Sequence, residues 1–480
     1  MGVRSVTVGS FPIERFRGLL GEDYADVQRA VERAAGVFEG RAIWHINSTA
    51  RGGGVAELLQ SLLAYTHGAG VDTRWLVVEG DPEFFAVTKR LHNRLHGAAG
   101  DGGDLGERER AAYEATLSGA ARELRGQVGP LDVVFCHDPQ TAGLVPMLAR
   151  AGARVVWRCH IGVDEPNERA REAWRFLRPY VEAADALVFS RRQFVWEGID
   201  PGRVWIVPPS IDAFSPKNQD LPDDSVAAIL GVMGLAEASG PAPEFRRLDG
   251  SPARVERRAE LDQDGPLPTD APVIAQVSRW DALKDPAGVL AGFAAHLRDE
   301  RAHLVLAGPD SSGVTDDPEG TRVLAEVREL RAGLPARVRE RTHLACLPMD
   351  DVDENAAMVN AIQRRADVIV QKSLAEGFGL TITEAMWKGR PVVASCRGAI
   401  QDMIEDGVSG ELLRDPTDLR AFAKRCDALL ADPGRAARIG AAARERVRER
   451  FLGTRHLLQY LDLLEALLEP GRRGTKAPLH

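Results

Sequence analysis

Two cations in the second half of the chain have the type and the spacing to bind a diphosphate. Arg279 and Lys284 lie five residues apart in QVSRWDALKDP, where an apolar run ends. Two such side chains can clamp a diphosphate and stabilise the charge that it gains when a bond to it breaks. The alternative is an arginine and a lysine solvated on a loop, which is the commoner fate of an isolated pair.

Two carboxylates flank an expected helix start further along the chain. In EGFGLTITEAM, Gly377 and Gly379 let the backbone approach a ligand, and the helix that follows points its N-terminus at the same place. Glu376 and Glu384 could accept hydrogen bonds from sugar hydroxyls and stabilise an oxocarbenium-like centre. The alternative for Glu384 is a capping box with Thr381, in which its side chain only satisfies an N–H group at the helix end.

A glycine triplet, Gly52 to Gly54, follows an expected strand over 41–47. The helix expected from Val55 onward has its apolar residues at helical spacing, so backbone N–H groups at its start could hold a phosphate. The triplet matches neither the dinucleotide-binding fingerprint nor the P-loop, and a simple tight turn is the alternative.

Two more groups of polar residues end expected strands in the first half of the chain. His160 closes WRCH, and His137 with Asp138 lies in CHDPQ. A lone histidine is more often structural than functional, and Asp138-Pro139 could equally begin a turn or a helix. Residue type and position alone therefore leave a structural role open for all three residues.

The elements that must position these residues alternate between Val- and Ile-rich runs and segments of helical period. This alternation predicts the α/β class, with parallel strands joined by crossover helices. The expected strands are 41–47, 73–78, 133–136, 155–159, 186–189 and 204–207 in the first half, and 273–277, 304–306, 368–370 and 392–394 in the second.

The spacing of these runs predicts two doubly wound domains, because 480 residues exceed one ordinary core. We expect an N-terminal domain over 1–211, a linker with an insertion over 212–270 and a second domain over 271–445. A C-terminal helix and tail over 446–480 should pack back on the N-terminal domain. Two such domains would place a ligand in a cleft between them, at the carboxyl ends of their strands.

Composition narrows the possible functions. The net charge of -9 gives no reason to expect nucleic acid as a partner, and no apolar run approaches the ~20 residues of a membrane span. The N-terminus lacks a signal peptide, so we expect a cytoplasmic protein. The five cysteines form no C-x-x-C pair, and the Asp-x-Asp sequences at 262–264 and 351–353 are interpreted as chance, so we expect no metal.

Several segments of the chain resemble those of a known family. The segment EGFGLTITEAMWKGRPVVAS resembles the signature of retaining GT-B glycosyltransferases of family four, and the spacing of Arg279 and Lys284 resembles their diphosphate site. WHINSTARGGGVAELLQSLL, CHDPQ, WRCH and NAIQRRADVIVQKSLAEGFG resemble the branch formed by trehalose glycosyltransferring synthase and trehalose phosphorylase. The resemblance extends from about residue 40 to about residue 455.

This resemblance implies a GT-B fold with two Rossmann-like domains facing across a cleft, and it implies roles for the candidate residues. The donor would lie mainly against the C-terminal domain and the acceptor against the N-terminal one. Glu376 would contact the donor sugar, Glu384 the ribose, and His160 the transferring sugar beside its anomeric centre. The implied catalytic residues are His160, Glu376, Arg279 and Lys284; the donor-binding residues are Gly53, Gly54, Arg279, Lys284, Glu376, Gly377, Phe378, Gly379, Leu380 and Glu384; and the acceptor-binding residues are His137, Asp138 and Asn47.

The implied reaction moves glucose from a nucleoside diphosphate glucose to glucose, giving trehalose by front-face retention without a protein nucleophile, metal or cofactor. After His160 the chain reads IGVDEPN where the family pattern is closer to IDLSxPN, so the acceptor side can differ. A phosphorylase and a transferase for another acceptor are the alternatives. A non-catalytic sugar-nucleotide-binding protein is disfavoured, because Glu376 and Glu384 are both present. The nucleobase and a homodimer stay open.

Overall fold

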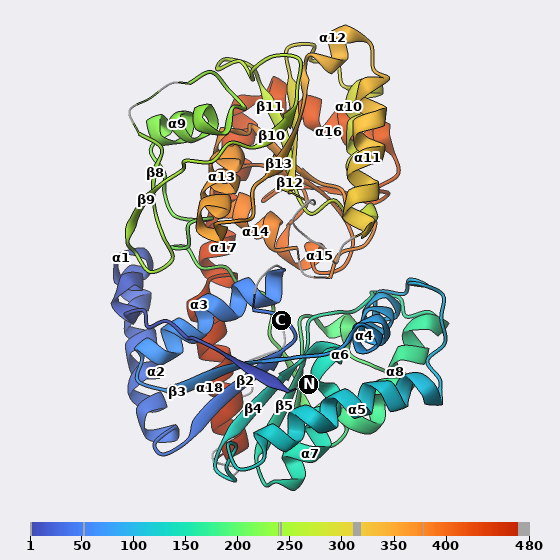
Figure 1. Ribbon diagram of the computed structural model, residues 1–480. Helices are drawn as coiled ribbons and strands as arrows, with labels where there is room; N and C mark the ends of the chain where they lie inside the picture. Colours follow the sequence, from blue (N-terminus) through green and yellow to red (C-terminus); the bar gives the residue numbers. More distant parts are fainter. Residues whose placement is uncertain are drawn as a thin grey trace. The chain divides into compact units, whose positions relative to one another are not determined.

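The computed structural model describes residues 2–50, 53–238, 240, 242–310, 318–377 and 379–468 (Figure 1). The chain forms two compact units. The first comprises Met1–Ser210 together with Gly453–His480, and the second comprises Ile211–Leu452. Each unit is built on one seven-stranded sheet.

The sheet of the first unit has the strand order β1-β3-β2-β4-β5-β6-β7. Neighbouring strands are parallel, except that β1 pairs antiparallel with β3. Every residue of β2 and β4 is buried, which explains their largely apolar sequences. The strands are β1 (Val3–Val6), β2 (Ala42–Asn47), β3 (Asp72–Val78), β4 (Val133–His137), β5 (Arg154–Cys159), β6 (Ala186–Phe189) and β7 (Val204–Ile206).

Two layers of helices cover the two faces of this sheet. The helices are α1 (Arg17–Leu20), α2 (Tyr24–Val37), α3 (Gly54–Gly68), α4 (Pro82–Leu95), α5 (Glu107–Leu124), α6 (Asp138–Thr141), α7 (Val145–Arg150), α8 (Glu168–Val181) and α18 (Gly453–Leu468). Trp44 and Val134 share a core with α4, α5, α7 and α8, whereas their neighbours Ile43 and Val133 share a core with α2, α3 and α18. Successive side chains of a strand point to opposite faces, so one strand serves both cores.

The sheet of the second unit has the order β10-β13-β12-β11-β14-β15-β16. Its strands are parallel apart from β10, which pairs antiparallel with β13 at the edge. The strands are β10 (Glu260–Asp262), β11 (Val273–Val277), β12 (His303–Pro309), β13 (Thr342–Leu347), β14 (Val368–Gln371), β15 (Val392–Ser395) and β16 (Glu411–Leu413), and β8 (Glu244–Arg246) pairs with β9 (Pro252–Arg254) in a separate hairpin.

Helices also surround this second sheet. They are α9 (Asp223–Met233), α10 (Pro286–His296), α11 (Pro318–Ala332), α12 (Ala336–Arg339), α13 (Val352–Arg365), α14 (Leu380–Trp387), α15 (Ile400–Met403), α16 (Leu419–Ala431) and α17 (Pro433–Arg450). Val289 of α10, Val327 of α11 and Phe422 of α16 pack with Ile274 of β11 in one apolar core. The predicted α/β class with two doubly wound sheets is therefore confirmed.

The segment 212–270, predicted to be a linker with an insertion, folds as part of the second unit. It contains α9 and the strands β8 to β10, and ion pairs attach it to the rest of the unit. Arg247 bonds both carboxylate oxygens of Asp351, at 2.9 and 2.6 Å, and Arg328 bonds Asp262 at 2.8 Å. Asp262 and Asp351 are the first residues of the two Asp-x-Asp sequences. Each therefore has an arginine partner within the second unit.

The C-terminal segment is divided between the units. Helix α17 belongs to the second unit, and the chain then returns to the first unit with α18. Tyr460, Leu463 and Leu464 of α18 are buried in the core that contains Ile43 and Phe135. The last helix thus covers one face of the N-terminal sheet.

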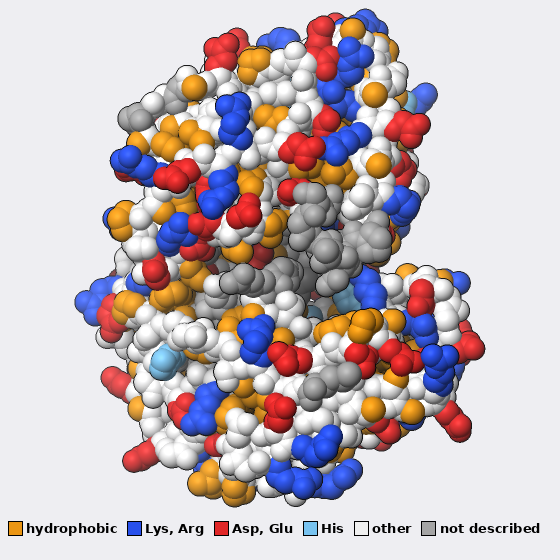
Figure 2. Space-filling model, viewed as in Figure 1, with side chains coloured by type: hydrophobic (Ala, Val, Ile, Leu, Met, Phe, Trp, Pro, Cys, Tyr) orange, Lys and Arg blue, Asp and Glu red, His pale blue; other side chains and the backbone are white. Residues whose placement is uncertain are grey.

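The surface mixes both signs of charge with scattered apolar side chains on the face shown in Figure 2. In the described parts of the chain, no helix combines the length and the apolar composition needed to cross a membrane.

Candidate active site

In the second unit the candidate residues gather where the winding of the sheet reverses. Strand β11 lies between β12 and β14. The chain leaves the carboxyl end of β11 toward β12 and the carboxyl end of β14 toward β15, so the two connections run in opposite directions. In doubly wound sheets ligands bind at this switch point. Arg279 and Lys284 follow β11, and Glu376 follows β14.

Lys284 and Glu376 form an ion pair at this place. The Nζ atom of Lys284 lies 2.5 Å from Oε2 of Glu376, and the hydroxyl of Ser373 donates to the same oxygen at 3.1 Å. The side chains are 17% and 7% exposed, so water screens the pair only partly. The sequence analysis singled out both residues but not their contact. The contact fixes the position of the glutamate, and an anionic ligand that binds Lys284 must compete with this glutamate.

Arg279 is more exposed than Lys284. Its guanidinium lies 3.2 Å from the carboxylate of Asp281, and 55% of its side chain is accessible. Asp281 also accepts a hydrogen bond from the backbone N–H of Leu283 at 2.8 Å. An exposed ion pair of this kind contributes at most about 1 kcal/mol, so the guanidinium can turn toward a ligand at little cost.

Buried residues that the sequence analysis missed hold the loop between β11 and α10. Lys372 is fully buried and binds the carboxylate of Asp285 and, at 2.9 Å, the carbonyl of Pro416. Asp285 has a φ of 51° and caps α10 by accepting from Gly288 N–H at 3.0 Å. The backbone N–H of Leu374 donates to the carbonyl of Leu283 at 2.8 Å. The end of β14 is thereby tied to the loop that carries Lys284.

The glycine-rich turn after Glu376 begins α14 without a side-chain cap. Gly379 is the N-cap residue, with a φ of 70° in the left-handed region that favours glycine, and Leu380 is the first helical residue. Thr381 is therefore inside the helix, and the capping-box alternative for Glu384 is wrong. Phe378 lies outside the described residues.

Glu384 is buried one turn into α14, with one oxygen 3.7 Å from Nζ of Lys217. The next turn carries Lys388, whose ammonium group donates to Asn218 Oδ1 at 3.1 Å and to the carbonyl of Glu384 at 3.2 Å. Burial lowers the pKa of Lys388 well below its usual value, while the nearby Glu384 opposes that shift. The segment around Asn218 thus packs against the helix that bears the second carboxylate.

Gly398 controls the backbone position of Glu376. A β-carbon at Gly398 would lie 1.6 Å from the carbonyl oxygen of Glu376, which no side chain tolerates. The loop after β15 can press on the loop after β14 only because this residue is glycine.

In the first unit the corresponding switch point lies between β2 and β4, since β2 has β3 on its other side. Asn47 ends β2, accepts a hydrogen bond from Trp75 Nε1 at 2.9 Å and donates to the carbonyl of Thr49 at 2.7 Å. Gly53 is the N-cap of α3 with a φ of 94°, and Gly54 is its first residue. The side chain of Asn47 therefore holds the chain that enters the glycine loop.

Three buried histidines form a continuous hydrogen-bonded row. His45 Nδ1 lies 3.0 Å from His137 Nε2, and His137 Nδ1 lies 3.1 Å from His160 Nε2. Burial, with help from the charge of Arg158, lowers the pKa of His45 to about 3. Burial likewise lowers the pKa values of His137 and His160 well below the usual value. All three imidazoles are therefore neutral at physiological pH, and His45 is a member that the sequence analysis did not single out.

Asp138 joins this row through the backbone. Its carboxylate accepts a hydrogen bond from the backbone N–H of His160 at 2.7 Å, and its φ of 61° is rare for a residue other than glycine. Burial raises the pKa of Asp138 to about 7. Asp138 also begins the short helix α6, so the predicted substrate contact and the predicted helix start fall on one residue.

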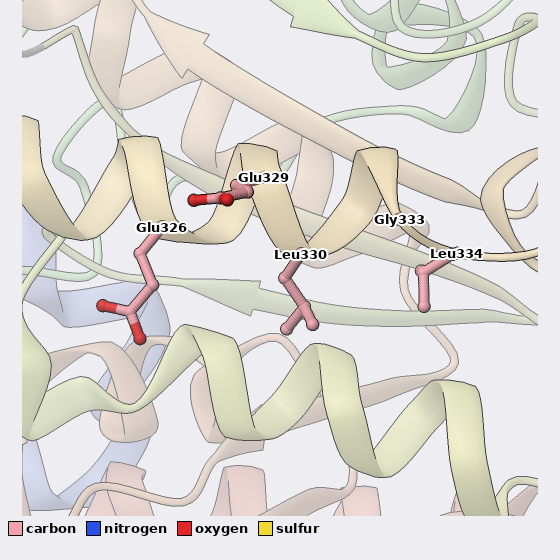
Figure 3. A pocket seen from close by; sticks show the side chains of 5 residues that line it. All are labelled: Glu326, Glu329, Leu330, Gly333 and Leu334. Carbon is pink, nitrogen blue, oxygen red and sulfur yellow. The ribbon is translucent and has the colours of Figure 1, made fainter.

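A shallow surface hollow lies elsewhere in the second unit, along the last turns of α11. Figure 3 shows its lining of Glu326, Glu329, Leu330, Gly333 and Leu334. None of the predicted site residues contributes to it. Among the residues that the structure describes, no group of three or more His, Cys, Asp or Glu side chains is arranged to hold a metal ion.

Family models match both halves of the chain. Residues 45–196 match the family model described as trehalose synthase, N-terminal domain, and residues 257–446 match the model for glycosyl transferases group 1. The fold is that of GT-B glycosyltransferases: the solved alpha,alpha-trehalose-phosphate synthase (UDP-forming) from Burkholderia vietnamiensis superposes with a TM-score of 0.62 at 15% identity, covering 88% of this chain and 96% of that one.

Sequence relatives define the family within this class. The chain is 34% identical to a trehalose synthase from Pyrococcus horikoshii over 97% of its own length and 99% of that protein. It is 28% identical to a trehalose phosphorylase from Pleurotus pulmonarius, over 77% of this chain and only 50% of that protein. The chain belongs to the trehalose synthase family of group 1 glycosyltransferases.

Replacing Gly398 by alanine should displace Glu376 and lower the glycosyltransferase rate by roughly 100-fold, the size of effect expected when a group that contacts the substrate is misplaced. Gly407→Ala is the matched control, since Gly407 also has a positive φ but no atom lies within 4 Å of an added β-carbon. Initial rates of both variants check this. An equal loss of activity in the two would attribute the effect to backbone strain alone.

Proposed function

We propose that the protein transfers glucose from a nucleoside diphosphate glucose to glucose and forms trehalose with retention of configuration, without metal or cofactor. The observation that carries the proposal is the pairing of Lys284 with Glu376 at the switch point of the second unit, with Arg279 and the start of α14 beside it. A cation, a carboxylate and a helix N-terminus at one strand edge suit a ligand that joins a diphosphate to a sugar.

In this mechanism Arg279 and Lys284 bind the diphosphate, and Lys284 exchanges part of its contact with Glu376 for the ligand. The bond between the sugar C1 atom and the diphosphate oxygen breaks, and the growing negative charge on the oxygen is stabilised by both cations. Glu376, held by Ser373, accepts hydrogen bonds from hydroxyls of the donor sugar. Glu384 contacts the ribose, and the glycine loop at Gly53 and Gly54 closes over the phosphates.

The acceptor hydroxyl attacks C1 from the face that the diphosphate leaves. Its proton passes to the departing phosphate oxygen, so the new C1–O bond forms on the same face and no protein nucleophile is needed. His160 hydrogen-bonds the transferring sugar, and His137, Asp138 and Asn47 lie on the acceptor side. Since His160 is neutral, it contributes a directed hydrogen bond and not a second positive charge. The cytoplasmic setting expected from the sequence is part of this proposal.

The first test is a product assay with purified protein, glucose and ADP-, UDP- or GDP-glucose in the presence of EDTA. We expect trehalose and nucleoside diphosphate in equal amounts from at least one donor. Nucleotide release without trehalose would point to another acceptor. Activity only with trehalose and inorganic phosphate would replace the proposal with a phosphorylase.

Removing the charge of Glu376 should separate catalysis from nucleotide binding. In Glu376→Gln we expect kcat to fall roughly 100- to 1,000-fold, while the affinity for nucleoside diphosphate stays equal or rises because Lys284 loses its competing partner. Glu329→Gln, at the exposed hollow of α11, is the control and should change neither quantity. Calorimetric titration beside steady-state rates measures both, and a parallel loss of affinity and kcat would contradict the assigned role.

Arg279→Ala should weaken nucleoside diphosphate binding by roughly tenfold, the effect of losing one charge-assisted hydrogen bond. Arg301→Ala is a matched control, because Arg301 is also exposed and also pairs with an aspartate two positions away in the sequence, in its case the preceding Asp299, at 2.9 Å. Its removal should leave the affinity unchanged. If the two variants bind nucleotide alike, Arg279 is a solvated surface residue and the clamp consists of Lys284 without it.

A further inference from the structure

The row of histidines in the first unit runs diagonally across one face of the sheet. His45 is opposite Phe135 on the neighbouring strand, and His137 is opposite Arg158 on the next. His137 comes two residues after Phe135, and His160 comes two residues after Arg158, so the three histidines lie on one face. Each of them is two residues nearer the carboxyl edge than the histidine before it. The row therefore connects a residue inside the sheet to His160 at the edge where the proposed substrate contacts lie.

Hydrogen bonds to the backbone and stacking of the rings hold the histidines of this row in place. The hydroxyl of Thr141 donates to the carbonyl of His137 at 2.7 Å, and Asp138 holds the backbone N–H of His160. The ring of His45 stacks on Phe135, with centroids 4.6 Å apart and planes inclined by 4°. The planes of His137 and His160 are inclined by 14°.

Elementary hydrogen-bond chemistry permits only two arrangements of such a row. A neutral imidazole has one N–H donor and one lone-pair nitrogen, and each bond needs one of each. Either all N–H groups point toward His160, so that its Nε2 accepts and its Nδ1 carries the proton, or all point toward His45 and His160 Nε2 carries the proton. Because the three rings are kept neutral, the tautomers of His45 and His160 are linked through His137.

We propose that His45 and His137 are positioning residues that set which ring nitrogen of His160 carries the proton, and so set the direction of its hydrogen bond to the transferring sugar. The role of His160 in this statement rests on the proposed function. The linkage itself rests on the two ring-to-ring distances. A purely apolar packing role for position 45 would be met by a ring like that of Phe135, which lies directly beside it.

Two nearly isosteric variants of His45 separate hydrogen bonding from packing. His45→Asn places a carboxamide where Nδ1 of the imidazole lay and keeps a partner for His137, whereas His45→Leu has the same branching without polar atoms. We expect kcat to fall roughly tenfold or more in His45→Leu and to recover largely in His45→Asn. If His45→Leu does not fold, His45→Phe takes its place.

A spectroscopic measurement without substrate completes the test. Proton–nitrogen correlation spectra of protein labelled with 15N in histidine report the tautomer of each ring, and a His160→Asn variant assigns the His160 signals. We expect the nitrogen shifts of His160 to change in His45→Leu and to return toward wild type in His45→Asn. Unchanged His160 shifts in His45→Leu, or equal activity of the Leu and Asn variants, would overturn the proposal. Failure of wild-type protein to form trehalose would instead overturn the proposed function, because the spectra need no substrate.

Discussion

Burial of both faces of a parallel sheet is the constraint on which the rest of this structure depends. It leaves the carboxyl edge at the switch point as the place where polar side chains can meet a ligand, and both units use it. In the second unit the edge brings Lys284 to Glu376. In the first it brings His137 to His160. Within the second unit, Gly398 and the buried Lys372 then fix the loops that its edge carries.

The two edges differ in their electrostatics. The edge of the second unit carries cations beside a carboxylate, which suits a ligand that is anionic at one end and rich in hydroxyls at the other. The edge of the first unit carries neutral imidazoles, and Asp138 beside them has a pKa raised by burial to about 7. Such groups discriminate by the direction of hydrogen bonds more than by charge. In the proposed reaction, recognition by charge belongs to the second unit, and recognition by the direction of hydrogen bonds belongs to the first.

The sequence predicts those parts of the structure that local pattern determines. Val- and Ile-rich runs located β2, β4, β11 and β14, and strand ends located Arg279, Lys284, His137, His160 and Glu376. Four strands of the two main sheets were not predicted: β1, β10, β13 and β16. Strands β1, β10 and β16 have only three or four residues, and the buried β13, with the sequence THLACL, lacks the Val- and Ile-rich pattern. The segment that contains β10 was interpreted as a linker because it is charged and rich in proline. The pairing of Lys284 with Glu376, the contact of Gly398 with Glu376 and the membership of His45 join residues far apart in the sequence. Only the folded sheet brings them together.

Helix α18 ties the order of synthesis to the order of folding. The face of the N-terminal sheet that contains Ile43 and Phe135 is covered in part by Leu463 and Leu464, which leave the ribosome after residues 211–452. At translation rates of roughly 5–20 residues per second, this apolar face waits on the order of tens of seconds while residues 211–452 are made. During that interval the nascent first unit exposes a hydrophobic surface that chaperones can bind. Its maturation therefore comes after, and not before, emergence of the second unit.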